Sequence, residues 1–362
     1  MTLAAGLGAT ACANANGEQT TGVARDPLPG ERRFASLTQL TFEGENAEAY
    51  FSSDGERLIF QRKHQGEYEC DQIFTIGVEG GEPNLVSTGL GRTTCGYFFP
   101  DDSRIVYSST HHASEACPTP PDLRQGYVWA LYDYNIYTAR PDGSDVQAIF
   151  SSPGYDAEAT ISPDGSRIVF TSTRDGDLDI YSMNPDGSDV RQLTDEPGYD
   201  GGPFFSPDGS KIVYRARYPE SEEELADYQA LLADNLVRPG VLDIYVMDAD
   251  GSNRRRLTDN GAANFAPFFH PDGDKIIFAS DMNDPEPPEF RPIHDQPGWD
   301  GAGAGDVQRG VRELPHVHAR RPPPRVRVEP ARLPRGEHEP LHRGVDRRTA
   351  RVTGRPRRAS NL

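Results

Sequence analysis

Acidic side chains stand at two fixed distances before an aspartate that recurs five times in the chain. The recurring residues are Asp54, Asp101, Asp164, Asp208 and Asp272. Six residues before them come Glu48, Cys95, Glu158, Gly202 and Ala266, and eight residues before them come Asn46, Thr93, Asp156, Asp200 and Asn264. The acidic members are therefore Glu48, Asp156, Glu158 and Asp200. If both sets line one channel, their carboxylates offer the oxygen ligands that a hard cation such as Ca²⁺ prefers. The alternative is a polar, water-filled channel without a metal ion, and we expect no other cofactor.

Aromatic and histidine side chains gather in one segment, Ser108–Tyr134. They are His111, His112, Tyr127, Trp129, Tyr132 and Tyr134. Exposed aromatic rings favour a surface that binds a ligand or another protein. Together with Asn46 and Asn264 they form our candidate binding face for a protein, a peptide or a glycan. The alternative is that the rings pack this segment onto the fold. The two adjacent histidines lack the spacing of a helical metal-binding pair.

The first of the four cysteines, Cys12, follows the small residues Ala-Thr-Ala. This pattern resembles a lipoprotein processing site, although the apolar run before it is shorter than that of an ordinary signal peptide. We therefore expect residues 1–33 to be a lipoprotein-signal remnant and a linker. The protein would then be periplasmic or secreted, with lipidation at Cys12 as its possible membrane anchor.

The other three cysteines are Cys70, Cys95 and Cys117. Export permits a disulfide. All three are expected on one side of the fold. Cys95–Cys117 is our first choice and Cys70–Cys95 the alternative, because spacing alone does not determine the pairing.

The elements that position these residues follow from the same repeat. Runs such as SPDGSRIVF (Ser162–Phe170) join a turn signal to a β-branched and aromatic run. Asp-Gly supplies the backbone conformations of a tight turn, and the run after it is typical of a strand. A second motif, DIYSMNPDGSD from Asp179, repeats the strand and the turn. Each unit therefore has four strands, and the shortest spacing of the recurring aspartates, 44 residues, fits one propeller blade.

These motifs resemble those of the PD40 or TolB-like family of WD40-like β-propellers. The resemblance covers residues 34–290 and implies an all-β fold of four-stranded blades, with six blades as the family type and an extracytoplasmic setting. This sequence holds motifs for about five blades, so we expect a ring that is not properly closed. Ser36–Phe42 (SLTQLTF) matches fourth-strand segments such as RQLTDEP from Arg191. It therefore looks like a closing strand that lacks the rest of its blade.

Residues 291–362 do not continue the repeat. They contain 16 Arg but no Lys, Phe or Tyr. Composition alone predicts a disordered basic tail rich in arginine and proline. We favour the hypothesis that this segment is blade sequence translated out of frame. Back-translation from Arg291, read one base later, allows DLYMINLDGTGLERVTF and FTPDGRRLAF, which are the missing motifs.

Two spacings of the recurring aspartates are longer, 63 and 64 residues. The excess falls between the second and third strands of blades two and four, on the side where the first strands begin. Two long insertions on one side favour a binding face there. The insertion of blade four predicts a helix over about 222–236 with a capping box of Ser221 and Glu224. We expect its apolar stripe to dock on the propeller, and capture of a partner is the alternative.

The net charge of the whole chain is −19. The basic tail holds 16 Arg and 8 Asp or Glu and so carries +8, which leaves −27 on the first 290 residues. This acidic charge argues against nucleic acid and anionic lipid as partners of the folded part. The sequence has no nucleophile-elbow, HExxH or phosphate-loop motif. We therefore expect an exported, monomeric, non-catalytic binding or scaffold module for an envelope protein, peptide or glycan. The alternative is a substrate-docking propeller related to those of peptidases and other hydrolases, without its catalytic domain. A catalytic propeller that uses the channel carboxylates is a third reading.

Overall fold

The structure is a computed structural model that describes residues 22–27 and 35–282. The chain divides into two units, Met1–Arg321 and Pro322–Leu362, and all described residues belong to the first. The predicted lipidation site Cys12 and the predicted tail 291–362 lie outside the described residues.

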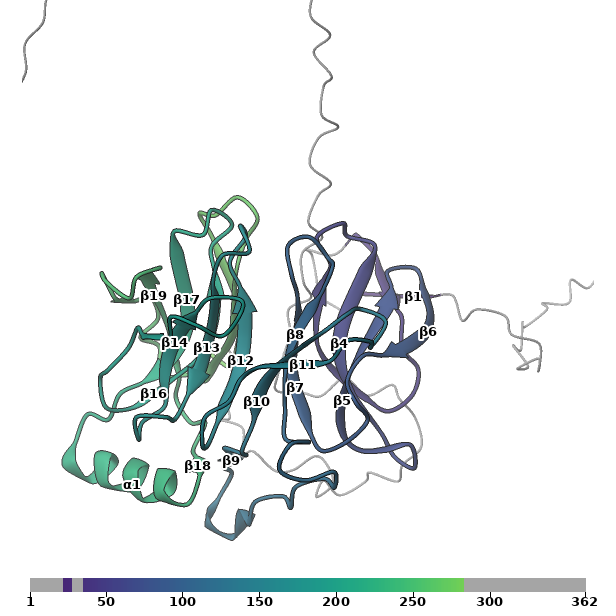
Figure 1. The fold of residues 1–362 in the computed structure, drawn as a ribbon. Coiled ribbons are helices and arrows are strands. Elements are labelled where there is room, and N and C mark those ends of the chain that lie inside the picture. Colours follow the sequence, from purple (N-terminus) through teal and green to yellow (C-terminus); the bar gives the residue numbers. More distant parts are fainter. Residues whose placement is uncertain (1–21, 28–34, 283–362) are drawn as a thin grey trace, which may run out of the picture. The chain divides into compact units, whose positions relative to one another are not determined.

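Four antiparallel sheets of four strands follow one another along the chain (Figure 1). Blade one comprises β3 (Glu45–Phe51), β4 (Arg57–His64), β5 (Tyr68–Gly77) and β6 (Gly80–Leu85). Blade two comprises β7 (Thr93–Phe98), β8 (Ile105–Ser109), β10 (Asn135–Ala139) and β11 (Gln147–Phe150). Blade three comprises β12 (Asp156–Ile161), β13 (Ile168–Ser172), β14 (Asp179–Met183) and β15 (Arg191–Gln192). Blade four comprises β16 (Tyr199–Phe205), β17 (Lys211–Arg217), β19 (Asp243–Asp248) and β20 (Arg255–Arg256). The predicted all-β propeller of four-stranded blades is confirmed.

A fifth blade is present in part. It consists of the two strands β21 (Asn264–Phe269) and β22 (Ile276–Ser280), which pair with each other. At the other end of the described chain, β1 (Val23–Arg25) pairs with β2 (Leu37–Gln39) in a separate two-stranded sheet. The segment predicted to be a closing strand therefore pairs with residues that precede it in the chain.

The Asp-Gly turns between the first and second strands are built by local hydrogen bonds. In blade three the Asp164 carboxylate accepts hydrogen bonds from the Ser162 hydroxyl and the Ser166 backbone, at 2.6 and 3.0 Å. These bonds stabilise the carboxylate and lower the pKa of Asp164 to about 2. Asp208 has the same partners in blade four, Ser206 and Ser210, and its pKa is also lowered to about 2. The turn aspartates are thus structural.

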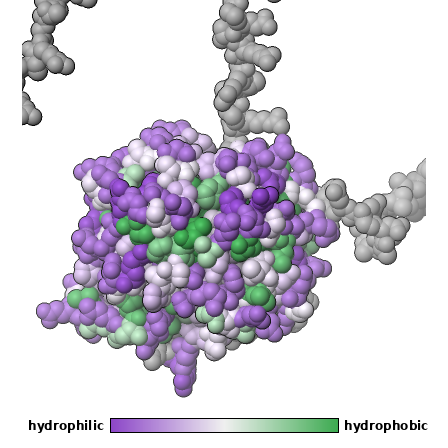
Figure 2. Space-filling model, viewed as in Figure 1, coloured by the Kyte–Doolittle hydropathy of each residue, from purple (hydrophilic) through white to green (hydrophobic). Residues whose placement is uncertain are grey.

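The second and third strands carry the core. The aromatic residue of the second strand lies opposite an aromatic residue of the third strand in every complete blade, and the second strands of blades two and three are fully buried. Apolar clusters join each blade to the next, for example Val106 and Ile136 of blade two with Ile168 and Phe170 of blade three. The face of the molecule in Figure 2 is mostly hydrophilic, with apolar residues in small, separate patches. In the described residues, no helix is long and apolar enough to cross a bilayer.

The two insertions join each other. That of blade two contains a short 3-10 helix (Leu123–Gln125) and β9 (Trp129–Ala130), and that of blade four contains α1 (Glu222–Ala233) and β18 (Leu236–Val237). β9 and β18 pair antiparallel, with Trp129 opposite Val237. Figure 1 shows β9, β18 and α1 together at one end of the blades. The prediction that both insertions lie on one side is confirmed.

Candidate functional site

Each first strand contains a β-bulge at the same place. The register shifts at the fourth residue of β3 and β16 and at the third residue of β7, β12 and β21. At that position the backbone is left-handed in every blade: Glu48 (φ 53°), Cys95 (φ 55°), Glu158 (φ 59°), Gly202 (φ 61°) and Ala266 (φ 47°). Such a conformation is uncommon for residues other than glycine, and a bulge re-aims a side chain. The five residues that stand six positions before the recurring aspartate therefore occupy the same structural position, the bulge of the first strand.

The bulge side chain of blade three is bound by blade four. Glu158 Oε1 accepts a hydrogen bond from Arg215 Nη2 at 2.5 Å. Glu158 Oε2 accepts from the Thr171 hydroxyl at 2.9 Å and from the Gly202 backbone N–H at 2.7 Å. The side chains of Glu158 and Arg215 are only 13% and 14% exposed. Arg215 Nε also donates to the Tyr199 hydroxyl at 2.8 Å. This fixed, charge-assisted network holds the centre of the candidate site.

The bulge side chains of blades one and two lie next to this network. The Glu48 side chain keeps contact with solvent although protein atoms surround it on most sides, and this burial raises the pKa of its carboxyl. A hydrogen bond with Cys95 lowers that pKa, while the negative charge of Glu158 raises it. Burial, followed by the charges of Glu48 and Glu158, raises the pKa of the Cys95 thiol well above its usual range. Cys95 is therefore a protonated, weakly nucleophilic thiol at neutral pH. We call Glu48, Cys95, Glu158 and Arg215 the axial cluster.

Aromatic rings lie next to the axial cluster, two positions further along the first strands. Tyr50, Tyr97, Phe204 and Phe268 come from blades one, two, four and five. The Tyr50 ring lies 5.4 Å from those of Tyr97 and Phe204 and 6.4 Å from that of Phe268. Blade three has Thr160 at this position, and its hydroxyl donates to the Pro203 carbonyl at 2.7 Å. At this position the first strand of each of the five blades thus contacts the first strand of another blade.

The insertions contact the axial cluster from their own side. Trp129 of β9 lies over the Arg215 guanidinium at 5.4 Å, and its ring is 5.9 Å from Phe265 and 6.4 Å from Tyr199. Leu131, Leu178 and Val237 bury an apolar cluster around these rings. The joined insertions therefore place an aromatic side chain over a buried ion pair.

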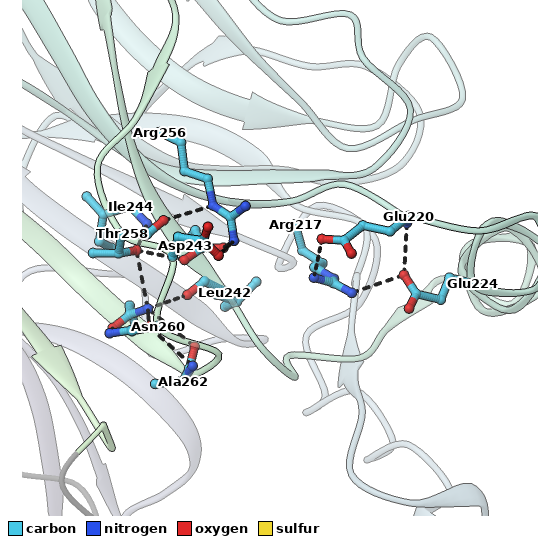
Figure 3. A network of polar contacts seen from close by, with 12 residues as sticks. Arg217, Glu220, Glu224, Leu242, Asp243, Ile244, Arg256, Thr258, Asn260 and Ala262 are labelled. Carbon is cyan, nitrogen blue, oxygen red and sulfur yellow. Dashed lines mark hydrogen bonds and ion pairs between the residues drawn. The ribbon is translucent and has the colours of Figure 1, made fainter.

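Helix α1 is docked on the fold, as its apolar stripe predicts. The Tyr228 hydroxyl bonds to Asp177 and donates to the Gly198 carbonyl. The Ser221 hydroxyl caps the helix by accepting from the Glu224 N–H at 3.2 Å. Figure 3 shows that the Glu224 carboxylate also contacts Arg217 and the Glu220 backbone, so that β17 and the helix start are joined. The helix ends at Ala233, three residues before the predicted end.

A recurring polar contact also fixes the fourth strand to the third. In blade four, Asp243 accepts hydrogen bonds from Arg256 at 2.5 Å and from the Thr258 hydroxyl at 2.8 Å (Figure 3). The Thr258 hydroxyl in turn accepts from the Ile244 N–H at 2.9 Å. Asp179 and Thr194 repeat this arrangement in blade three. The Asp of the DIY motif and the Thr of the LT motif are therefore structural partners.

The predicted calcium ligands do not come together. The buried Asp156 accepts hydrogen bonds from Ser152 and Arg174, and the buried Asp200 accepts from the Tyr218 hydroxyl at 2.7 Å. Only Glu48 and Glu158 belong to the axial cluster. Within residues 22–27 and 35–282, no three His, Cys, Asp or Glu side chains are placed to hold a metal ion. The reason is the bulge, which re-aims the side chain six residues before the recurring aspartate relative to the side chain eight residues before it.

Both predicted disulfides are wrong, because the structure joins Cys70 to Cys117. Their Cα atoms are 5.7 Å apart, within the usual range for a disulfide. The Gly91 N–H donates to the Glu115 carbonyl at 2.8 Å, which holds the insertion of blade two near the start of that blade. Cys95 is left as a free thiol because its bulge places it beside Glu48 and Thr94.

The predicted binding face is only partly open. Tyr134 is 4% exposed and Asn264 is fully buried, where it hydrogen-bonds the Leu242 carbonyl at 2.7 Å. A hydrogen bond of 2.7 Å joins His111 Nδ1 to the Ser109 hydroxyl. The centroid of the His111 ring lies 4.3 Å from that of the Tyr137 ring. Tyr127 accepts a hydrogen bond from Trp129.

The remaining members lie at the edge of this face. Tyr132 donates to the Thr119 carbonyl at 3.2 Å, and the exposed His112 lies 3.5 Å from Asp133. The Asn46 amide donates to the Glu43 carbonyl at 3.0 Å. Trp129, Tyr127 and Tyr132 therefore remain half-exposed candidates for binding.

Sequence reasoning missed Arg215, Tyr199 and Tyr155. Arg215 stands in β17 where the other second strands have Gln61, Ser108, Thr171 and Ala279. A positive charge in this otherwise neutral position was the available signal. Burial raises the pKa of Tyr199 and of Tyr155 above their ordinary range, so both phenols are neutral hydrogen-bonding groups.

The chain is similar to several known proteins. The family model of the TolB β-propeller domain, PD40, matches residues 130–231. A TolB candidate from Agrobacterium tumefaciens is 22% identical with a TM-score of 0.48, and the match covers 67% of this chain and 77% of that one. TolB from Acinetobacter baumannii is 20% identical with a TM-score of 0.44, and the match covers 63% of this chain but 46% of that one. An oligogalacturonate lyase in complex with manganese is 18% identical with a TM-score of 0.42, covering 67% of this chain and 65% of that one.

Proposed function

Because this chain is a TolB-like β-propeller, we propose that it is a non-catalytic binding module whose ligand docks on the side formed by the two insertions. The observation that carries the proposal is the β9–β18 pair, which joins insertions from two non-adjacent blades and sets Trp129 over the axial cluster. Long loops held by a rigid scaffold are where binding residues concentrate. Here the scaffold holds them through hydrogen bonds and buried apolar contacts.

The chemistry of this side suits a protein, a peptide or a glycan. Trp129, Tyr127 and Tyr132 offer half-exposed rings, which supply large contact area with little loss of conformational freedom. The neighbouring insertion adds the carboxylates of α1, whose first turn contains Glu222, Glu223 and Glu224. A ligand with an apolar or sugar face and hydrogen-bond donors fits this combination.

The proposed setting is the cell envelope, outside the cytoplasm, with the chain acting as a monomer. Support comes from the Cys70–Cys117 disulfide, since such bonds persist in oxidising compartments. A lipid anchor at Cys12 belongs to the same proposal. The acidic charge of the chain favours partners other than nucleic acid.

The test is a screen of peptide and oligosaccharide arrays with the purified chain, repeated with variants. Trp129→Ala and Tyr132→Ala should each weaken binding about tenfold or more, since anchor rings at interfaces carry over 1 kcal/mol. The control is Arg140→Ala, in the exposed turn after β10 at the opposite end of the blade, which should bind normally. Thermal denaturation confirms that all variants fold. Binding that responds to Arg140→Ala but not to Trp129→Ala, or no binding on either array, would overturn the proposal.

A further inference from the structure

The second strand of each complete blade is paired on both sides. β4, β8, β13 and β17 lie between the first and third strands of their sheets. The registers agree, because an aromatic residue of the second strand always faces an aromatic residue of the third. The pairs are Phe60–Phe74, Tyr107–Tyr137, Phe170–Tyr181 and Tyr214–Tyr245, with ring centroids 6.0, 5.9, 5.9 and 5.7 Å apart. The ladder between these two strands is therefore an interface that the chain forms four times.

In the part of the chain that the structure describes, the fifth blade has two strands, β21 and β22. Among residues 22–27 and 35–282, β22 pairs only with β21. Its Phe278 corresponds to Phe170 and Tyr214 in position, yet no aromatic ring of the described chain lies opposite it in this way. The sequence after β22 contains no further Asp-Ile-Tyr motif. Within the described residues, β22 thus occupies the place of a second strand, and no third strand pairs with its other edge.

Burial supports the same conclusion independently. Phe60, Tyr107, Phe170 and Tyr214 are between 0% and 3% exposed. Phe278 is half-buried, as are Ile276 and Ile277 before it, whereas the equivalent pairs in blades two to four are fully buried. The inner side of this strand is packed, because Phe278 and Ile276 contact a cluster that includes Val213 and Ile244. A third strand would cover Phe278, since each of its counterparts in blades three and four lies beside an aromatic ring of the third strand.

We propose that the free edge of β22 binds an extended segment of another polypeptide with the third-strand pattern Asp/Asn-Ile-Tyr-x-Met/Ala. The segment adds to blade five as an antiparallel strand, with its tyrosine opposite Phe278. Main-chain hydrogen bonds supply affinity and alternate side chains supply specificity, as in other cases of strand addition. This surface is separate from the side formed by the insertions, so the inference does not depend on the proposed function.

The third strand of blade three shows which amides matter. The Ile180 N–H points toward the fourth strand, since it donates to the Thr194 hydroxyl. Directions alternate along a strand, so the amides of Tyr181 and Met183 point toward the second strand. A peptide with the sequence of residues 177–185, DLDIYSMNP, is therefore the probe. N-methylation at its tyrosine and methionine blocks the edge that faces β22, and N-methylation at its isoleucine and serine modifies the other edge.

The experiment measures binding of the labelled peptide to the full chain by fluorescence anisotropy, and protection of β22 amides by hydrogen exchange. We expect the peptide to protect the amides of Ile276–Ser280. N-methylation at tyrosine and methionine should weaken binding on the order of tenfold or more, because two main-chain hydrogen bonds are lost. N-methylation at isoleucine and serine should change it much less. Phe278→Ala should also weaken binding, with β21–β22 folding checked by exchange.

Three results would each overturn the proposal. Binding that does not depend on which edge is N-methylated would show that no ladder forms. Protection of β22 in a monomeric chain without peptide would show that the chain covers this edge itself. A dimer with protected β22 in the absence of peptide, seen by sedimentation, would assign the edge to a second copy of the chain.

Discussion

The guanidinium of Arg215 on β17 lies 2.5 Å from the carboxylate of Glu158 on β12, so one buried ion pair joins blades three and four at their bulges. The pair is complete only because Thr171, Gly202 and Tyr199 satisfy the remaining polar atoms.

Removing Arg215 alone should be strongly destabilising. Arg215→Met leaves the Glu158 carboxylate buried without its counter-charge, a change that costs about 3–5 kcal/mol in comparable pairs. Urea denaturation measures the loss. The control Lys211→Met on the same strand removes the exposed pair with Asp248 and should cost less than about 1 kcal/mol. Equal losses in both variants would mean that the Arg215 pair is not desolvated.

The pairing of Cys70 with Cys117 can be tested chemically. Alkylation of the denatured, unreduced protein should label Cys95 and leave Cys70 and Cys117 unmodified. Cys117→Ser should lower the free energy of unfolding by about 2–4 kcal/mol, because the bond closes a loop across 47 residues of sequence separation. Cys95→Ser should leave the disulfide intact. Labelling of Cys70 in the native oxidised protein would contradict the structure.

The buried Asp179 should make stability depend on pH. Burial raises its pKa to about 6, above the value of 3.8 that the free side chain has. The protonated form is therefore favoured in the folded state. Its contribution to stability is fully present below about pH 4 and is lost as the pH rises through 6, by up to about 3 kcal/mol.

Asp179→Asn keeps an oxygen that accepts from Thr194 and removes the charge. The variant should lose less stability than the parent between pH 4 and 7, as measured by urea midpoints. Asp243→Asn is the matched change in blade four, and it should destabilise at neutral pH because it removes the ion pair with Arg256. If the stability of the parent and of the Asp179→Asn variant changed with pH in the same way, the raised pKa of the buried Asp179 carboxyl would be contradicted.

The docking of helix α1 on the propeller should depend on the Tyr228 hydroxyl. Tyr228→Phe removes the hydroxyl that bonds to the Gly198 carbonyl and to the Asp177 carboxylate, which costs about 1–3 kcal/mol. We expect faster hydrogen exchange in α1 and β18, with little change in β13. Ser221→Ala at the helix start should cost about 1 kcal/mol. Unchanged exchange in α1 for Tyr228→Phe would mean that apolar packing alone docks the helix.

The fold was predictable from the sequence because its determinants are local. In blades three and four the Asp-Gly turns are built from hydrogen bonds between residues at most five apart, such as Ser162 with Arg167, so the motif itself specifies the turn. The same applies to α1, whose cap and stripe lie within one segment. Sequence spacing grouped the residues at this position as a candidate channel lining, but it predicted neither the bulge nor its left-handed backbone.

The candidate site was less predictable because it depends on contacts between blades. The pairing of Glu158 with Arg215 spans 57 residues of sequence, and nothing local indicates it. Asp156 and Glu158 differ in role because the bulge between them changes their directions. The same bulge places Cys95 away from Cys117, so counting residues selected the wrong disulfide.

The β9–β18 pair has a consequence for how the protein comes apart. In a simple repeat array each unit is coupled only to its neighbours, and units can open one after another from either end. Here a short strand pair ties blade two to blade four, so blade three sits inside a closed circuit of contacts. A pulling force or a thermal fluctuation cannot release blade three while the β9–β18 pair remains intact. The three blades should therefore unfold as one cooperative block.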